Sequence, residues 1–348
     1  MTTQKAVVIT LPHTGSLVSD GRMPTLRDDC ILVKTVSVAV NPSDWKLITF
    51  LAPSGVHVGC DYSGVVEAVG KDVKKKFTKG DGVCGFVHGS NPMQPEDGAF
   101  AEYIVAKGDL QIKIPDGMSF QEATTLGAGI NTVGQVYKNL RLNLPTNPIK
   151  NAVPILIYAG STATGTLAIQ FAKLSGYMVL TTCSPHNFDL VRRFGADAVF
   201  DYNDPGAARE IRQSTNNNLK LVLDCISDDA SMEFCDNALS TEGGEYNSWP
   251  SVAIERANVN SSQTIVYTSI GETFELGPLS FPAKPEDKAF AQEFLAIAEP
   301  LLAENKITVH PVKLGKGGLQ GVLDGIEQLK AGKVSGEKLV YNVAETPN

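Results

Sequence analysis

The residues best suited to chemistry form a glycine loop between a strand-sized apolar run and an amphipathic run. The loop consists of Gly160, Ser161, Thr162, Ala163, Thr164 and Gly165. Such a loop presents backbone N–H groups and a helix N-terminus to an anion, and its glycine spacing after a strand is typical of a dinucleotide-binding turn. We therefore expect it to bind the pyrophosphate of a nicotinamide dinucleotide. The alternative is a Ser/Thr-rich turn that binds no ligand.

Three hydroxyl groups in this loop accompany the two glycines. Gly160 and Gly165 are expected to give a tight turn and a close approach of helix to strand. Thr162 occupies the place of a middle glycine, but Ser161, Thr162 and Thr164 add hydroxyl donors beside the helix dipole. A phosphate site is therefore expected without that glycine.

A second polar group, about 20 residues further along, indicates which dinucleotide is bound, because enzymes that use NAD place an Asp or Glu there for the ribose 2′-hydroxyl. This chain has Ser184, Pro185, His186 and Asn187 instead, and its first carboxylate, Asp189, comes after the predicted strand. A hydroxyl, an imidazole and an amide can accept a 2′-phosphate. The cations available nearby are Lys173, Arg192 and Arg193. The sequence therefore favours NADPH over NADH.

Alternating strands and helices must position these two groups. The predicted strands cover residues 155–158, 178–182, 198–200, 221–224 and 264–268. The predicted helices between the first three cover residues 164–175 and 187–194, and a glycine follows the end of each. This alternation predicts a parallel, doubly wound α/β sheet.

The first 110 residues follow a different pattern, in which short β-branched runs are separated by turns. The predicted strands there cover residues 6–10, 30–39, 63–69, 82–87 and 100–105. This pattern predicts a compact β-rich domain. Ser119, with Glu122 three residues later, predicts a capped helix start. Helices at 288–304 and 318–329 and a strand at 338–343 are expected to complete the chain.

The composition excludes several function classes. The chain has 30 basic and 38 acidic residues and a net charge of -8, which disfavours a nucleic-acid partner. No apolar run is long enough to span a membrane, and the N-terminus lacks a secretory signal, so we expect a soluble, cytoplasmic protein. The 6 cysteines include no Cys-x-x-Cys pair, which disfavours both a disulfide framework and a four-cysteine zinc site.

Segments before the glycine loop resemble the medium-chain dehydrogenase/reductase superfamily. They are Asn41–Lys46, Gly59–Gly70, Lys79–Asp81 and Gly98–Tyr103. The resemblance implies an α/β fold in three parts. A GroES-like, β-rich catalytic domain would cover residues 1–125, and a Rossmann domain that binds NADPH would cover residues 126–272. Residues 273–348 would return to the catalytic domain.

Zinc-bearing members of that superfamily have cysteine and histidine ligands at places that match Asn41, Cys60 and Ala128. Only one plausible ligand is left among these three, whereas a catalytic zinc ion needs three from the protein. We therefore expect no metal, and an alcohol dehydrogenase of the zinc type is disfavoured.

Within the zinc-independent branch, the chain resembles the fungal trans-acting enoyl reductases that serve highly reducing polyketide synthases. The resemblance is carried by residues 159–165, 183–187, 199–202, 223–226 and 333–340. It implies an NADPH-dependent enzyme of secondary metabolism, which reduces the α,β-double bond of an enoyl thioester held on the acyl carrier domain of a synthase.

The same resemblance implies which residues form the site. The nicotinamide would be bordered by Ser43, Asp44, Trp45, Lys46, Val334 and Ser335. The pyrophosphate would lie on residues 161–164, the 2′-phosphate on residues 184–187, and the adenosine beside Tyr202. The acyl site would be lined by Thr132, Val133, Gly134, Ile270 and Gly271.

Two of these residues are our candidates for catalysis. Lys46 would stabilise the enolate charge or relay a proton, and Thr132 would donate a hydrogen bond. Mitochondrial enoyl-thioester reductases carry a proton-donating Tyr a few residues after the matching segment, but Leu47–Leu51 contain none. The proton is then expected from solvent. The alternative for Lys46 is a surface lysine whose stem covers the rim of the cleft.

A run of lysines also needs an interpretation. It contains Lys71, Lys74, Lys75, Lys76 and Lys79. A solvated turn is the default, and a docking patch for the acidic carrier domain is the sharper hypothesis.

Two other function classes stay open: an NADPH-dependent quinone oxidoreductase of the same superfamily, and a protein that binds NADPH without catalysis. Many relatives dimerise through the last strand of the Rossmann sheet. Here that strand is expected to lead into Glu272–Pro278, and a proline can protect an edge from pairing, so we expect a monomer.

Overall fold

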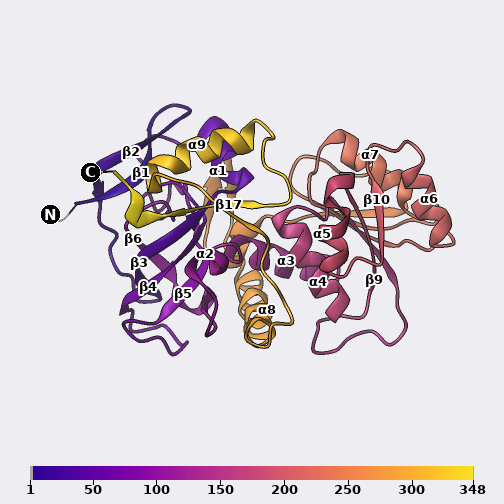
Figure 1. Cartoon of the computed structure of the whole chain (residues 1–348), viewed down its shortest axis with the longest axis horizontal. Coiled ribbons are helices and arrows are strands. Elements are labelled where there is room, and N and C mark those ends of the chain that lie inside the picture. The colour runs from indigo at the N-terminus through magenta and orange to yellow at the C-terminus, as the bar shows by residue number, and fades with distance from the viewer. Residues whose placement is uncertain (1–2, 348) are drawn as a thin grey trace. The chain divides into compact units, whose positions relative to one another are not determined.

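The computed structural model describes residues 3–347, which form two compact units (Figure 1). The first unit contains the described residues up to Asn131, together with Tyr267–Ala303 and the described residues from Val309 onward. The second unit contains Thr132–Val266 and Glu304–Thr308. The chain thus leaves the first unit and returns to it.

The first unit is built on a β-sheet in which the two ends of the chain meet. The strands lie in the order β16 (Val312–Leu314), β17 (Lys338–Asn342), β3 (Cys30–Ala39), β4 (Asp61–Val69), β5 (Gly82–Phe86) and β7 (Gln111–Lys113), and β6 (Tyr103–Lys107) also pairs with β3. β17 runs antiparallel to β3 with Val340 opposite Ala39, so the yellow C-terminal strand in Figure 1 lies among the N-terminal strands. A hairpin of β1 (Thr3–Leu11) and β2 (Thr14–Arg22) completes this β-rich part.

Most helices of this unit are short. α1 (Pro42–Lys46) continues into a π-helical turn, η1 (Leu47–Leu51), and α2 (Phe120–Ala123) begins at the predicted capping box. There the Ser119 hydroxyl accepts from the N–H of Glu122 at 3.2 Å, and the Glu122 carboxylate accepts from the N–H of Ser119 at 2.9 Å. The longer helices are α8 (Pro285–Ala303) and α9 (Gly318–Lys330), and a small hairpin joins β14 (Phe274–Leu276) to β15 (Leu279–Phe281).

The second unit has the predicted doubly wound, parallel sheet. Its order is β10 (Ala198–Asp201), β9 (Met178–Cys183), β8 (Pro154–Tyr158), β11 (Leu221–Asp224), β12 (Gly244–Ser248) and β13 (Val259–Gln263), with every pair parallel. The strand order reverses between β8 and β11, and ligands of open α/β sheets bind at the carboxyl end of such a switch point. The helices wholly within this unit are α4 (Ala163–Leu174), α5 (Phe188–Arg193), α6 (Ala207–Ser214) and α7 (Asp229–Ala238), while α3 (Gly127–Asn139) begins in the first unit and enters the second at Thr132.

The predicted strand at residues 264–268 is wrong. Its β-branched residues belong to a loop and a 3-10 turn, η4 (Val266–Ile270), in which Tyr267 and Thr268 are buried. Burial explains the apolar pattern without a strand. The edge strand is β13, whose polar residues Val-Asn-Ser-Ser-Gln are half-buried or exposed and carry no strand signal.

The argument for a monomer is also wrong, because it took residues 264–268 as the last strand of the sheet. The strand at the sheet edge, β13, leads into Thr264 rather than into residues 272–278. Pro278 lies instead in the turn of the β14–β15 hairpin, which is a separate two-stranded sheet. The monomeric state stays a prediction, but Pro278 no longer supports it.

Candidate active site

The glycine loop connects β8 to α4 and is held by its own groups. Ala159 has a left-handed backbone with φ of 60°. Thr162 is the N-cap of α4: its hydroxyl accepts from the N–H of Gly165 at 3.0 Å and donates to the carbonyl of Ala159 at 2.9 Å. A Cβ atom on Gly165 would lie 2.6 Å from that carbonyl oxygen, and one on Gly160 would lie 2.0 Å from Thr181 Oγ1. Both glycines are therefore needed for the close approach that the sequence predicts.

One of the three predicted hydroxyl donors has another role. Because the Thr162 hydroxyl both caps α4 and bonds within the loop, it is not directed at a ligand. Ser161 and Thr164 are half-buried at the start of this 12-residue helix. Their hydroxyls and the first N–H groups of the helix, which have no acceptor within it, can receive an anion there.

The residues predicted for the adenosine end lie together. Ser184 follows β9, and Tyr202 follows β10, in which Asp201 pairs with Cys183. The Ser184 and Tyr202 hydroxyl oxygens are 3.3 Å apart, and Tyr202 is 42% exposed. Both residues thus stand at the carboxyl edge of the parallel sheet, where the β8 loop also lies. His186 and Asn187 belong to the 3-10 turn Pro185–Asn187 that follows Ser184.

Lys173, proposed as a cation for the 2′-phosphate, lies at the wrong edge of the sheet. It is near the C-terminal end of α4, roughly 15 Å along the helix from the glycine loop at 1.5 Å per residue. Its ammonium is paired at 2.8 Å with Asp197, which also accepts from the N–H of Val179 in the first part of β9. The other two candidates, Arg192 and Arg193, are exposed on α5, which begins beside the Ser184 turn.

In the first unit, the predicted nicotinamide-side residues lie on α1. Asn41 is its N-cap, and the Asp44 carboxylate accepts from the N–H of Asn41 at 2.6 Å. Ser43 and Trp45 are half-buried. Lys46 is exposed, its ammonium lies 5.8 Å from the centre of the Trp45 ring, and it makes no ion pair with residues 3–347. An unpaired cation at this helix end is available for a developing negative charge.

Asp44 differs from its neighbours because its side chain is only 1% exposed. Burial raises its pKa from 3.8 to about 8, since a carboxylate loses its hydration there. Oδ1 has no hydrogen-bond partner among the described residues. The side chain therefore holds the start of α1, and a direct contact of Asp44 with a cofactor would have to come from its backbone.

A buried charge network occupies the places that match zinc ligands. Asn41 Nδ2 donates to Asp61 Oδ2 at 2.8 Å, and the N–H of Ala128 donates to Asp61 Oδ1 at 2.6 Å. The Lys338 ammonium lies 2.5 Å from Asp61 Oδ2. Cys60 is buried with its thiol 3.8 Å from the Tyr267 hydroxyl, and burial raises the thiol pKa far above its usual range. An asparagine, a backbone amide and an ammonium do not fit a zinc ion.

Tyr267 and Lys338 are two residues of this region that sequence reasoning missed. The Tyr267 ring stacks on His88 with centroids 4.0 Å apart, and burial lowers the His88 pKa to about 3, so His88 is neutral. Tyr267 was placed in a predicted strand, and Lys338 was one residue of a predicted strand without any special role. No local pattern singles out either residue, because their partners are far away in sequence.

The residues predicted for the acyl site and the remaining nicotinamide border lie in several elements. Thr132, Val133 and Gly134 are buried within α3, with Thr132 9% exposed and Val133 fully buried. Ile270 is buried, and Gly271 has a φ of 75° that favours glycine. Val334 is half-buried against the core of the first unit, and Ser335 precedes β17. Their shared roles stay predictions.

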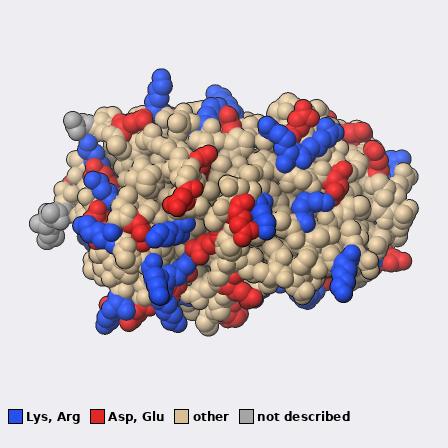
Figure 2. All heavy atoms as spheres, turned by 60° about the horizontal axis from the view of Figure 1, so that its bottom comes forward, with Lys and Arg blue, Asp and Glu red and all other residues tan. Residues whose placement is uncertain are grey.

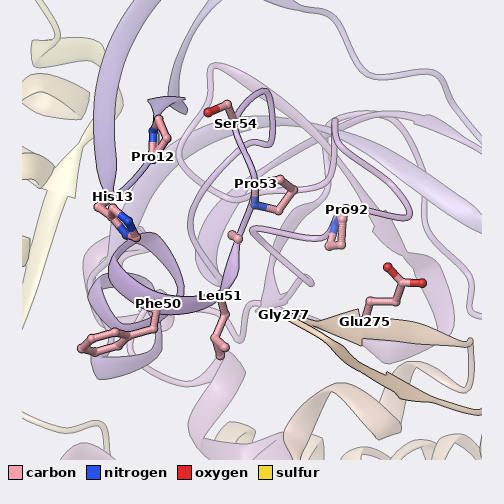
Figure 3. Close-up of a pocket in the computed structure, with 10 residues that line it drawn as sticks. Pro12, His13, Phe50, Leu51, Pro53, Ser54, Pro92, Glu275 and Gly277 are labelled. Carbon is pink, nitrogen blue, oxygen red and sulfur yellow. The ribbon is translucent and has the colours of Figure 1, made fainter.

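A shallow groove of about 300 Å³ lies next to α1 in the first unit (Figure 3). Phe50 and Leu51 of η1 line it together with Pro53, Pro92 and the β14–β15 hairpin. Phe50 is 67% exposed and Leu51 beside it is 38% exposed, so the two side chains form a small apolar patch. The groove therefore offers apolar surface within a few residues of Lys46.

The lysine run between β4 and β5 is largely neutralised. Lys71 pairs with Asp28 at 3.1 Å, Lys75 with Glu299 at 2.5 Å and Lys79 with Glu67 at 2.8 Å. Lys74 and Lys76 are exposed and make no ion pair with residues 3–347. On the face drawn in Figure 2, basic side chains are interspersed with acidic ones. The run is thus a weaker positive patch than its sequence suggests.

Within residues 3–347, no helix combines the length and the apolar character that a membrane span requires. No group of three or more His, Cys, Asp or Glu side chains in the same range could hold a metal ion.

Comparisons with known proteins agree with this architecture. A family model described as alcohol dehydrogenase GroES-like domain matches residues 27–116, and one described as zinc-binding dehydrogenase matches residues 163–246. The solved quinone oxidoreductase from Coxiella burnetii superposes with a TM-score of 0.73 at 24% identity, over 98% of this chain and 99% of that one. At this identity the likeness shows the fold alone.

Two curated relatives are much more similar in sequence. The chain is 58% identical to trans-enoyl reductase TOXD of Cochliobolus carbonum, over 84% of this chain and 99% of that protein. It is 47% identical to trans-enoyl reductase resD of Aspergillus sclerotiorum, over 97% of this chain and 100% of that protein. These identities extend across both units and confirm the resemblance seen in the sequence. The chain belongs to the family of fungal trans-enoyl reductases.

Proposed function

We propose that the chain is a trans-acting, NADPH-dependent enoyl reductase of secondary metabolism. It reduces the α,β-double bond of a polyketide enoyl thioester while the substrate is held on the acyl carrier domain of a highly reducing polyketide synthase. The observation that carries this proposal is the 58% identity to a trans-enoyl reductase over 84% of the chain. The protein acts in the cytoplasm and needs no metal ion.

The choice of NADPH rests on the turn after β9. Ser184 and Tyr202 place two hydroxyl groups there, 3.3 Å apart. The nearest carboxylate in sequence, Asp189, has a side chain that is 96% exposed and is paired with Arg192 at 3.4 Å. An NAD enzyme would have a carboxylate at the turn itself, where it would repel a 2′-phosphate. Ser161 and Thr164 bind the pyrophosphate with the first N–H groups of α4.

Bound NADPH supplies a hydride for the β-carbon of the substrate, and negative charge then develops on the thioester oxygen. Lys46 stabilises this charge, because its ammonium is exposed and has no acidic partner among residues 3–347. Thr132, in the second unit, is the proposed hydrogen-bond donor to the substrate. The α-carbon takes its proton from solvent, directly or through Lys46. The exposed apolar surface at Phe50 and Leu51 suits an acyl chain.

An assay of the purified chain tests this function. It follows NADPH oxidation at 340 nm with crotonyl-pantetheine and with an enoyl group loaded on a carrier domain, and simple quinones serve as competing substrates. We expect turnover of both thioesters, faster turnover of the carrier-bound one, and at least a tenfold preference for NADPH over NADH. Turnover of quinones alone would establish the quinone reductase alternative, and NADPH binding without any turnover would establish a non-catalytic protein.

A further inference from the structure

The buried ammonium of Lys338 has no part in the function described so far. We infer that Lys338 is a positioning residue, whose ammonium takes the place of a metal ion in the first unit and fixes the start of α1, and thereby Lys46. The link to catalysis rests on the proposed function. The metal and positional parts of the inference do not, and they can be measured separately.

The Lys338 ammonium and the side chains of Asp61 and Asn41 form a closed ring of hydrogen bonds. Lys338 Nζ donates to Asp61 Oδ2 at 2.5 Å and to Asn41 Oδ1 at 2.9 Å, and Asn41 Nδ2 donates to Asp61 Oδ2 at 2.8 Å. Lys338 is 4% exposed, and Asp61 is fully buried. A charge at such depth is retained only when it is paired and hydrogen-bonded, and each member of the ring satisfies the other two.

The ring stands where the superfamily has its catalytic metal. Two of the three places that match zinc ligands, Asn41 and Ala128, both donate to the Asp61 carboxylate instead. Asp61 needs a cation at this depth, and Lys338 provides it from β17. A divalent ion could not share the site, because two cations a few ångströms apart repel strongly in a medium of low dielectric constant.

The ring acts on the proposed catalytic residue Lys46 through α1, whose 5 residues continue directly into the 5 residues of the π-helical turn η1. A helical segment shorter than about 12 residues is marginal on its own, so the place where this one begins depends on the groups that hold its N-terminus. Its N-cap is Asn41, whose side chain is fixed by Lys338 and Asp61, and its last residue is Lys46. Removal of the ring should therefore leave the helix start free to shift and displace the Lys46 ammonium.

The test uses the double variant Lys338→Met/Asp61→Asn. Removing Lys338 alone would leave a buried carboxylate without a partner and could unfold the chain, whereas the double variant is neutral, and the oxygen of the introduced amide can still accept from the Ala128 N–H. The matched control is Lys313→Met/Glu337→Gln. It removes an ion pair of the same length, 2.5 Å, whose two side chains are 43% and 33% exposed beside β17.

Two readouts separate positioning from loss of fold. In a Trp249→Phe background, Trp45 is the only tryptophan, so its fluorescence reports on α1. We expect its emission to shift to the red in the Lys338/Asp61 variant and to stay unchanged in the control, with the far-UV circular dichroism unchanged in both. We also expect kcat to fall by about a hundredfold, the size of effect that a displacement of about 1 Å can produce.

A coupling experiment makes the inference specific. If the ring acts by placing Lys46, then Lys46→Met should cost about a hundredfold in kcat in the natural chain but less than about threefold in the Lys338→Met/Asp61→Asn background. An unshifted Trp45 emission, or a full Lys46 effect in that background, would overturn the positioning role. One equivalent of zinc in the purified natural chain, measured by elemental analysis, would overturn the replacement of a metal. If the natural chain reduces no enoyl thioester, the proposed function fails, while the fluorescence and zinc measurements still decide on Lys338.

Discussion

Helix α4, which follows the glycine loop, and helix α1 both begin at residues that are proposed to contact the cofactor. The starts of the two helices are held in different ways. In the loop, Thr162 caps α4 and bonds to Ala159, so all partners lie within a few residues. At α1, the N-cap Asn41 accepts from Lys338, which is 297 residues away in sequence. The loop therefore depends on the shape of its own backbone, whereas α1 depends on distant charged residues. Substitutions in the loop should therefore change NADPH binding most, whereas substitutions at α1 should change kcat most.

The largest effect is expected for Gly165→Ala in the loop. The new Cβ atom would lie 2.6 Å from the carbonyl oxygen of Ala159 and 2.7 Å from Gly160 Cα, and backbone atoms cannot yield as a flexible side chain can. We expect about a hundredfold weaker NADPH binding and a loss of roughly 1–3 kcal/mol in the free energy of unfolding. NADPH titration by fluorescence and denaturant unfolding measure both.

The control for this variant is Gly206→Ala in the same unit. The Cβ atom there would meet only Asp204 Oδ1, at 3.2 Å, and Gly206 has an ordinary right-handed backbone. Its stability should be unchanged or rise by about 0.4–1 kcal/mol. Equal NADPH affinity in the Gly165 and Gly206 variants would show that the loop is not the pyrophosphate site.

The next effect concerns α1 and is expected to appear in kcat. Lys46→Met removes the exposed ammonium without touching the buried ring, so the helix should stay in place. We expect kcat to fall by about a hundredfold, the size seen when one group that stabilises a developing oxyanion is removed, with a much smaller change in NADPH affinity. Steady-state kinetics on crotonyl-pantetheine measure this. The exposed Lys316→Met serves as control. A variant with natural kcat would make Lys46 a surface lysine only.

The different origins of these two regions explain what the sequence could predict. Gly160, Gly165 and the strand–loop–helix order around them are local, so the fingerprint identified the loop and the doubly wound sheet. β3 and β11 were predicted to the residue because both are rich in β-branched and apolar side chains. The ring at α1 joins Asn41, Asp61 and Lys338 across antiparallel strands. No residue spacing in the sequence predicts contacts between such distant residues.

The errors have the same physical origin. Residues 264–268 have the β-branched composition of a strand but are buried in a loop and a 3-10 turn, and β2 and β13 have polar sequences that read as loops. Lys173 was near the 2′-phosphate residues in sequence, but α4 carries it to the opposite edge of the sheet. Tertiary placement, which composition does not reveal, decided each of these cases.

A smaller effect is expected at the adenosine end of the cofactor region. Ser184→Asp introduces the carboxylate that NAD enzymes have at this turn, where it would repel a 2′-phosphate and bind a 2′-hydroxyl. We expect NADPH to bind about tenfold more weakly, about 1.4 kcal/mol, with NADH binding equal or tighter. Lys173→Gln, at the other edge, should leave both affinities unchanged. A Ser184 variant that still prefers NADPH by the natural ratio would place the 2′-phosphate elsewhere.

The smallest effect is expected for the exposed lysines, which belong to neither region. Lys74 and Lys76 are the members of the run that have no acidic partner among residues 3–347, so their charges are the least compensated toward an acidic carrier domain. Rim charges act mainly on the association rate and are screened by salt. Lys74→Glu/Lys76→Glu should therefore lower kcat/KM on carrier-bound substrate by about threefold at low salt, and by less at high salt. Turnover of crotonyl-pantetheine, which has no carrier domain, should not change. An equal loss on both substrates would point to damage of the fold, and no loss on either would leave the run as a solvated turn.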